Sequence, residues 1–204
     1  ESCFHYSKIL PHHLIGEKYL AAIGLVAYVL WLIPSMFAAV AIGATALIAR
    51  FAGQSQWRLA RRTVHQSLLV GAALACVATV VSWATVEWFV CQVQLTGEAA
   101  QLATVYLRCL VIVIPAIMLE TVGIACLRGA GDTVSGLWTM AVVNVINVLL
   151  SWLLVIGIAP FPKLGWLGLA VGTVCGHCVG AIMVLRFLIV GRLRLDFMQS
   201  GCRF

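Results

Sequence analysis

Charged residues are scarce in this chain of 204 residues. Lysine and arginine together number 13 and aspartate and glutamate only 7, so charged side chains make up 10% of the sequence while hydrophobic ones make up 63%. A water-soluble domain of this length needs far more charge to cover its surface. With a mean hydropathy of +1.06, the composition excludes an ordinary soluble domain and predicts a membrane protein.

The apolar residues gather in runs long enough to cross a bilayer. About 20 apolar residues in a helix span the hydrocarbon core, which is roughly 30 Å thick. Five such stretches predict an all-α, polytopic bundle of five transmembrane helices: residues 19–49, 63–86, 102–127, 133–162 and 164–185. The chain then divides into an extracytoplasmic lead-in over residues 1–18, a transmembrane helix bundle over 19–190, and a cytoplasmic basic tail or inter-lobe linker over 191–204.

The arginines predict how the bundle is oriented. They follow the first, third and fifth predicted spans, in the set Arg50, Arg58, Arg61, Arg62, Arg128, Arg186, Arg192, Arg194 and Arg203. Cytoplasmic loops collect lysine and arginine, so we expect this side in the cytoplasm of a cell membrane, the start of the chain outside and its end inside. Residues 1–18 contain no signal peptide, so we expect an earlier crossing before them. The same rule explains the net charge of +6, and nucleic-acid binding is not inferred from it.

The eight cysteines do not amount to a disulfide framework. Five of them fall inside the predicted spans, where cysteine usually behaves as a small buried hydrophobe: Cys76, Cys109, Cys126, Cys175 and Cys178. The tetrad Cys175-Gly-His-Cys178 has the spacing of a thiol–disulfide exchange site, but a thiolate in mid-span would be poorly solvated. A membrane thiol oxidoreductase that uses Cys175 and Cys178 is thus kept only as an alternative to the main reading. The tetrad has too few ligands for a closed zinc site, so no metal is predicted.

Glu120 is the carboxylate that the cost of burial singles out. It lies about seven residues, or roughly 10 Å, from the arginine-rich end of its predicted span. An ionisable side chain at this depth is costly and is by default a functional hypothesis. Low dielectric favours the neutral acid, which suits a residue that binds and releases a proton. The alternative is that Glu120 pairs with an arginine or a backbone group at the inner rim.

The fourth predicted span contains three polar residues on one helical face. Asn144, Asn147 and Ser151 are spaced three and four residues apart. In a bilayer such side chains must face another helix or a wet cavity, and the sequence leaves both readings open. Together with Glu120, Asn144 and Asn147 are the candidates for an ion or substrate pathway, and no catalytic residue is predicted.

Glycine recurs at every fourth position of the fifth predicted span, at Gly168, Gly172, Gly176 and Gly180. This spacing places all four residues on one side of a helix. Small residues let two membrane helices approach closely. The glycine stripe therefore predicts a surface for helix packing.

The turn after the third predicted span carries a recognisable signature. The sequence Cys126-Leu-Arg-Gly-Ala-Gly-Asp-Thr133 resembles the Leu-Arg-Gly-x-Gly-Asp-Thr sequence that closes the fourth helix of multidrug and toxic compound extrusion (MATE) transporters. Residues 43–53, 144–150 with Gly157, and 164–173 are similar to parts of the family's second, fifth and sixth helices. On this resemblance the chain supplies helices two to six of a twelve-helix transporter, as an incomplete N-terminal lobe.

The resemblance implies a transporter and not an enzyme. Family members exchange sodium ions or protons for drugs and organic cations by alternating access, and no bound cofactor is implied. Arg128, Gly129, Gly131 and Asp132 carry over as a structural turn at the cytoplasmic rim. The lipid bilayer, a first helix that in many relatives holds a coupling aspartate, and a C-terminal lobe are the implied partners. A flippase of lipid-linked sugars from the same wider superfamily stays as an alternative.

Overall fold

The chain folds into five long helices. The computed structural model describes residues 14–92, 98–157 and 164–201, and this part of the chain contains helices and turns but no strand. The helices are α1 (Leu14–Gly53), α2 (Trp57–Gln92), α3 (Glu98–Gly129), α4 (Thr133–Ile156) and α5 (Trp166–Gly201). Each helix contains a stretch long and apolar enough to cross a membrane. The prediction of an all-α bundle with five spans is therefore confirmed.

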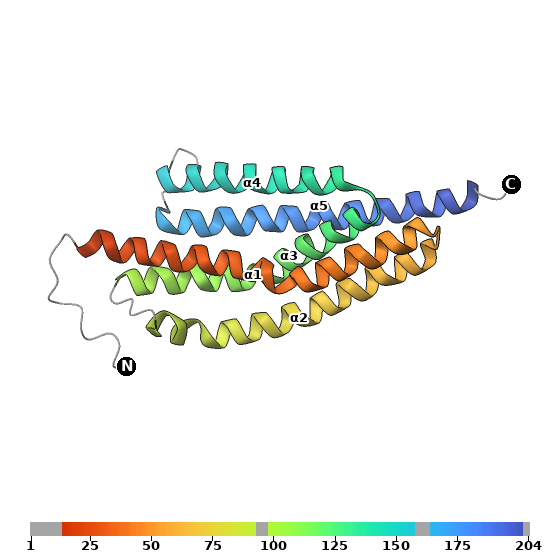
Figure 1. Ribbon diagram of the computed structural model, residues 1–204. Coiled ribbons are helices and arrows are strands. Elements are labelled where there is room, and N and C mark those ends of the chain that lie inside the picture. The colour runs from red at the N-terminus through yellow and green to blue at the C-terminus, as the bar shows by residue number, and fades with distance from the viewer. Residues whose placement is uncertain (1–13, 93–97, 158–163, 202–204) are drawn as a thin grey trace.

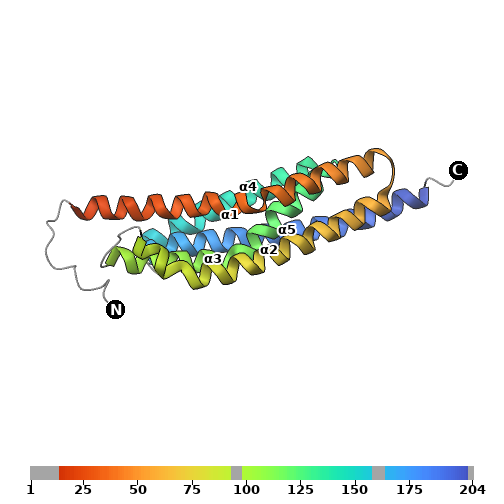
Figure 2. The ribbon, with the colours of Figure 1, turned by 60° about the horizontal axis from the view of Figure 1, so that its bottom comes forward.

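Helix α3 lies at the centre of the bundle. Helices α4 and α5 form a hairpin on one side, α2 lies on the other, and α1 packs along α3 (Figures 1 and 2). The span within α3 is 72% buried, against 22% for the spans in α1, α2 and α4. Leu110, Ile114 and Val122 of α3 are fully buried, as is Phe37 of α1. The hydrophobic core of the described chain is therefore centred on α3.

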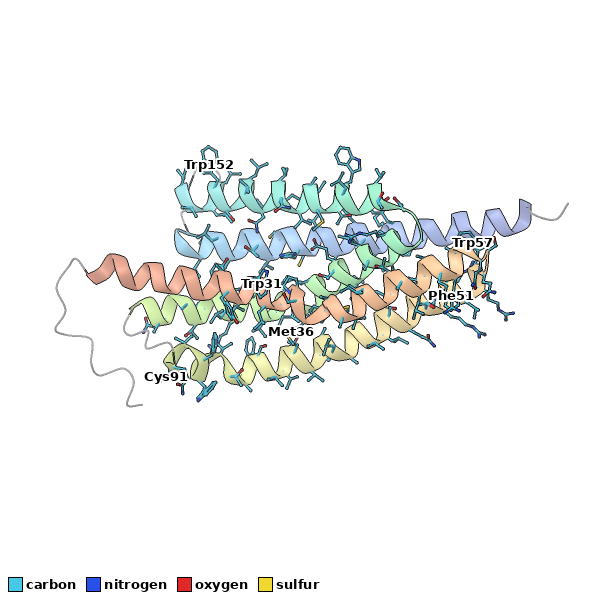
Figure 3. All side chains as sticks on the ribbon, in the orientation of Figure 1. Trp31, Met36, Phe51, Trp57, Cys91 and Trp152 are labelled. Carbon is cyan, nitrogen blue, oxygen red and sulfur yellow. The ribbon has the colours of Figure 1, made fainter. Side chains whose placement is uncertain are left out.

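Successive helices run in opposite directions, which brings most described arginines to one end. The α1–α2 turn and the α3–α4 turn meet at this arginine-rich end, which holds Arg50, Arg58, Arg61, Arg62 and Arg128. The opposite end carries three exposed indoles, from Trp83, Trp88 and Trp152, of which Trp152 projects outward from α4 (Figure 3). Tryptophan is enriched where a membrane meets water, so the two ends have the character of two membrane surfaces.

The outer faces of α2 and α4 are covered with large apolar side chains. Leu69 and Val80 on α2, and Leu137 and Val148 on α4, are each more than half exposed. A surface of this kind is unsuited to water, but lipid tails solvate it well. The exposure pattern is therefore that of helices that face a bilayer.

Several helix boundaries differ from the predicted ones. Helix α1 begins at Leu14 and α3 at Glu98, each a few residues early, and α5 continues to Gly201. The basic segment 57–62, expected as a loop, forms the first turns of α2 instead. Hydropathy detects only the part of a helix that crosses the bilayer. Arginine, leucine and glutamine are good helix formers, so the helices continue beyond the apolar spans into the polar region.

Candidate functional site

A cavity lies between α1, α3, α4 and α5, beside the proline of α1. Its volume is about 620 Å³. Pro34 lies inside α1 and lines the cavity, and α1 changes direction near its middle (Figure 1). A proline within a helix removes a backbone hydrogen bond and favours such a bend. The walls are mainly apolar, and the polar side chains that line them are Thr45, Glu120, Thr121, Arg128 and His177.

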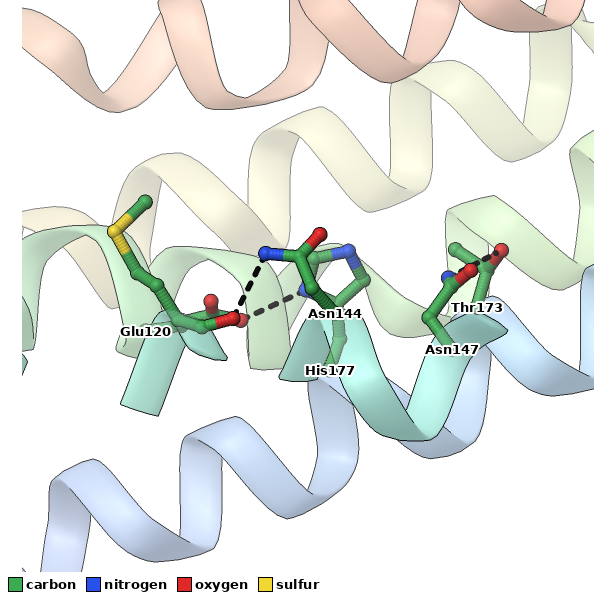
Figure 4. A network of polar contacts seen from close by, with 6 residues as sticks. Glu120, Asn144, Asn147, Thr173 and His177 are labelled. Atoms are coloured by element: carbon green, nitrogen blue, oxygen red, sulfur yellow. Dashed lines mark hydrogen bonds and ion pairs between the residues drawn. The ribbon is translucent and has the colours of Figure 1, made fainter. Parts of the chain in front are cut away.

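Glu120 and His177 form the polar centre of this cavity. The His177 Nδ1 atom lies 2.7 Å from the Glu120 Oε2 atom, so the imidazole of α5 contacts the carboxylate of α3 directly (Figure 4). Only 10% of the Glu120 side chain and 22% of the His177 side chain are exposed. Glu120 therefore pairs with a histidine of another helix, whereas the sequence suggested an arginine or backbone partner.

The contact depends on a close approach of α3 and α5 that glycine permits. A Cβ atom on Gly180 would lie 3.0 Å from Glu120 Oε2 and 2.5 Å from Val143 Cγ2. A Cβ atom on Gly123 of α3 would lie 2.2 Å from Val184 Cγ1 of α5. Since real Cβ contacts are longer than these distances, a larger residue at either position would push the helices apart and pull the carboxylate away from the imidazole.

The two asparagines proposed for the pathway lie in different surroundings. The Asn147 Nδ2 group donates a hydrogen bond to the Thr173 hydroxyl of α5 at 3.0 Å (Figure 4). The Asn144 Nδ2 group donates to the Met140 carbonyl of its own helix at 2.8 Å, and the residue is exposed. Asn147 therefore joins α4 to α5, while Asn144 lies on the surface of the described chain. Neither residue lines the cavity that holds Glu120.

The glycine stripe of α5 lies against α4. A Cβ atom would come within 2.8 Å of Leu154 Cβ from Gly168 and within 2.2 Å of Ser151 Oγ from Gly172. From Gly176 it would come within 3.1 Å of the Val143 carbonyl oxygen. The four glycines are buried. Gly180, the last of the four, meets both α4 and Glu120 of α3.

The signature turn between α3 and α4 is built from backbone and capping hydrogen bonds. Asp132 is the N-cap of α4, and its carboxylate accepts hydrogen bonds from the Ser135 backbone N–H at 3.0 Å and the Ser135 hydroxyl at 2.6 Å. Gly131 has a φ of 91°, which favours glycine. A Cβ on Gly129 would lie 2.9 Å from the Thr45 carbonyl oxygen. Arg128 is exposed and lines the cavity.

Two other groups of side chains lie outside the cavity. Arg108 and Glu87 form an exposed ion pair at the arginine-poor end, where the guanidinium also lies 5.8 Å from the ring centre of Trp83. Cys175 is half-buried and Cys178 is exposed on α5. None of these side chains contributes to the walls around Glu120.

His177 is the functional candidate that sequence reasoning missed. In the sequence analysis it enters only as the histidine of the Cys175-Gly-His-Cys178 tetrad. The useful signal was that His177 and Glu120 are both ionisable residues well inside predicted spans, because such residues usually find one another across a bundle.

The fold defines a class of protein. Five helices, each with a stretch long and apolar enough to cross a bilayer, give the architecture of a multi-pass membrane protein. A family model described as MatE matches residues 3–153 of the chain. The chain therefore belongs to the MatE family, as its signature turn predicted.

Individual relatives agree with this assignment. The chain is 27% identical over 175 residues to the probable multidrug resistance protein NorM of Thermotoga maritima, a match that covers 86% of this chain and 38% of the relative. It is 26% identical over 187 residues to an FAD transporter of Shewanella oneidensis, covering 89% and 41%. The chain thus spans about two-fifths of the length of these curated relatives.

Solved structures show the same helical arrangement. A MATE crystal structure in the bent conformation superposes with a TM-score of 0.79 at 26% identity, covering 87% of this chain and 39% of that one. An inward-facing MATE family transporter gives a TM-score of 0.77 at 25% identity, covering 84% and 38%. An outward-facing one gives 0.72 at 25% identity, covering 85% and 38%. The helices of this chain are therefore arranged as in MATE transporters.

Proposed function

We propose that the chain is part of a transporter that exports drugs and organic cations across the cell membrane, driven by the entry of sodium ions or protons. Membership of the MatE family and the likeness to proteins named for multidrug resistance support this function. The arginine-rich end would face the cytoplasm, in keeping with the usual placement of basic residues. Helices beyond those of this chain would complete the path for the substrate.

The observation that carries the proposal is the cavity around Glu120. Sites for drug-sized molecules usually enclose roughly 300–1,000 Å³ behind mainly apolar walls with a few polar groups. The cavity of about 620 Å³, with Ile42, Ile117 and Ile124 in its walls and Glu120 as the acidic group among its lining residues, fits this description. A carboxylate in such surroundings attracts an organic cation whose remaining surface is apolar.

Alternating access is the mechanism that the family likeness favours. This chain superposes on a transporter in an inward-facing state and on one in an outward-facing state. A lobe that resembles both states suits a mechanism in which largely rigid units reorient around a midplane site. A flippase of lipid-linked sugars would need basic groups to hold phosphate. The basic side chains that line this cavity are Arg128 and His177.

The proposal is tested by drug susceptibility. An efflux-deficient bacterial host would express the full-length protein that contains this chain, either unchanged or with Glu120→Gln. We expect the unchanged protein to raise the tolerated concentration of cationic drugs and dyes, and the variant to lose that resistance at equal membrane abundance. Glu87→Gln, which alters an exposed carboxylate at the arginine-poor end, is the matched control and should retain resistance.

The outcomes separate the parts of the proposal. Resistance that survives Glu120→Gln would keep the exporter but remove Glu120 from its substrate path. A failure to export cationic drugs, together with export of FAD by the same cells, would show that the protein shares the cargo of its relative from Shewanella oneidensis and would refute the proposed substrate class.

A further inference from the structure

We propose that a second pocket, between α2 and α5 at the arginine-rich end, binds one anionic phospholipid, with an acyl chain between the helices and the lipid phosphate on Arg61. Among the described residues, none lines both this pocket and the cavity around Glu120. The inference therefore concerns a separate site, and it does not depend on which cargo the transporter carries.

The pocket fills a gap between two helices that do not pack closely on each other. Its floor comes from α1 and α3 and includes Ile48 and Cys126, each only 1% exposed. One wall is formed by α2 and the other by α5, where Leu185 and Ile189 are exposed. The gap is thus bounded by apolar side chains that remain accessible from outside the described bundle.

The size and the walls of the pocket suit a hydrocarbon chain. Its volume is about 210 Å³, which is below the roughly 300–1,000 Å³ of sites for drug-sized molecules. Val64 and Leu68 of α2 face the pocket together with Leu188 of α5. Apolar cavities exclude water and accept apolar guests. The pocket therefore fits one narrow apolar chain better than a whole drug molecule.

The wall formed by α2 runs from the membrane surface into the apolar region. Its residues are spaced three or four apart along one side of the helix: Trp57, Ala60, Arg61, Val64, His65 and Leu68. Trp57 is the first residue of α2 and lies at the arginine-rich end (Figure 3), and tryptophan is typical of the membrane surface. Leu68 lies seven residues beyond Arg61, about 10 Å along the helix axis. A lipid with its phosphate near Arg61 would therefore extend its chain towards Leu68.

The charge of the pocket favours an anionic head group. Arg61 lines the pocket, and Arg58 and Arg62 are exposed within one turn of it. Among the described residues that line the pocket, none is acidic. Arginine can lay its aliphatic stem along an apolar wall while its guanidinium lies toward water, and a guanidinium binds phosphate through two parallel hydrogen bonds. Basic pockets between membrane helices bind anionic lipid head groups in this way.

The test counts lipids bound to the purified full-length protein by native mass spectrometry. The delipidated protein is titrated with phosphatidylglycerol, or with phosphatidylcholine that has the same acyl chains. We expect one phosphatidylglycerol molecule to bind more tightly than phosphatidylcholine. Arg61→Gln should weaken phosphatidylglycerol binding about fivefold, the factor for one arginine near a membrane surface. Arg50→Gln, which removes an exposed arginine of α1 at the same end but outside the pocket, is the matched control and should bind normally.

A second variant tests the apolar part of the site. Ala130 is exposed in the turn after α3 and lines the pocket, so Ala130→Leu places a larger apolar side chain there without changing the charge. We expect this variant to bind both lipids more weakly, with an unchanged melting midpoint in the absence of lipid, which shows that it is folded. Phosphatidylglycerol should raise the midpoint of the unchanged protein but not of Ala130→Leu, because a ligand that binds only the folded state stabilises it.

The remaining outcomes would overturn the proposal. Equal affinities for the two head groups, or an equal loss from Arg50→Gln, would remove the phosphate from Arg61. Glycerol phosphate that binds as tightly as phosphatidylglycerol would show a phosphate site without a pocket for the chain. A full-length protein that retains no lipid would show that another of its helices covers the gap, and the export function would stand unaffected.

Discussion

Alanine in place of Gly172 should force α4 and α5 apart. A Cβ atom at this position would lie 2.2 Å from Ser151 Oγ, 2.9 Å from the Ser151 backbone nitrogen and 3.0 Å from the Asn147 carbonyl oxygen. Two of these three atoms belong to the backbone, so a change of side-chain rotamer cannot relieve the clash. Overpacking of this kind costs about 1–3 kcal/mol of stability.

Gly43→Ala is the matched control for this change. Gly43 also lies inside a long helix, but a Cβ atom there would meet nothing within 4 Å. Alanine is a better helix former than glycine by about 0.8–1.0 kcal/mol, and this gain is common to both variants. The difference between the two therefore isolates the packing cost between α4 and α5.

The assay is thermal unfolding of the purified full-length protein in detergent. A loss of stability lowers the melting midpoint, so Gly172→Ala should melt below Gly43→Ala. Equal midpoints, or a higher one for Gly172→Ala, would refute the close packing of the glycine stripe on α4.

Two further predictions concern the signature turn and the cysteines. Asp132→Ala removes the side chain that caps α4, so it should lower the free energy of unfolding by about 1 kcal/mol and the melting midpoint accordingly. Asp132→Asn, which can still cap the helix, should recover most of the loss, and equal losses from both changes would contradict a capping role. The double change Cys175→Ala and Cys178→Ala should leave drug resistance of the efflux-deficient host intact. Loss of resistance at equal membrane abundance would instead favour the thiol chemistry that the Cys175-Gly-His-Cys178 spacing suggests.

The sequence predicts the spans well because the bilayer imposes a simple rule on them. A helix that crosses lipid must remain apolar for about 20 residues, and this length makes the five runs visible without any knowledge of packing. The ends of the helices are less visible. Residues 57–62 are basic and look like a loop, yet they form the first turns of α2.

The site is only partly visible in the sequence because its partner lies far away along the chain. Glu120 stands out through the cost of burying a carboxylate. His177 is 57 residues distant, and their contact depends on how α3 and α5 are rotated about their axes. Helical spacing alone does not determine this rotation. The same limit applies to the glycine stripe, since its spacing predicts close packing but does not identify α4 as the partner.

The central position of α3 has a consequence for how this lobe tolerates change. On α2 and α4, an outward-facing leucine can be exchanged for valine or phenylalanine, because fluid lipid adapts to either shape. On α3 72% of the span is buried, so an exchange at most of its positions leaves a void or creates a clash. Glu120 belongs to this same helix. We therefore expect random mutagenesis to place most of the intolerant positions of this chain on α3. A substitution there can disturb both the packing of the bundle and the cavity around Glu120.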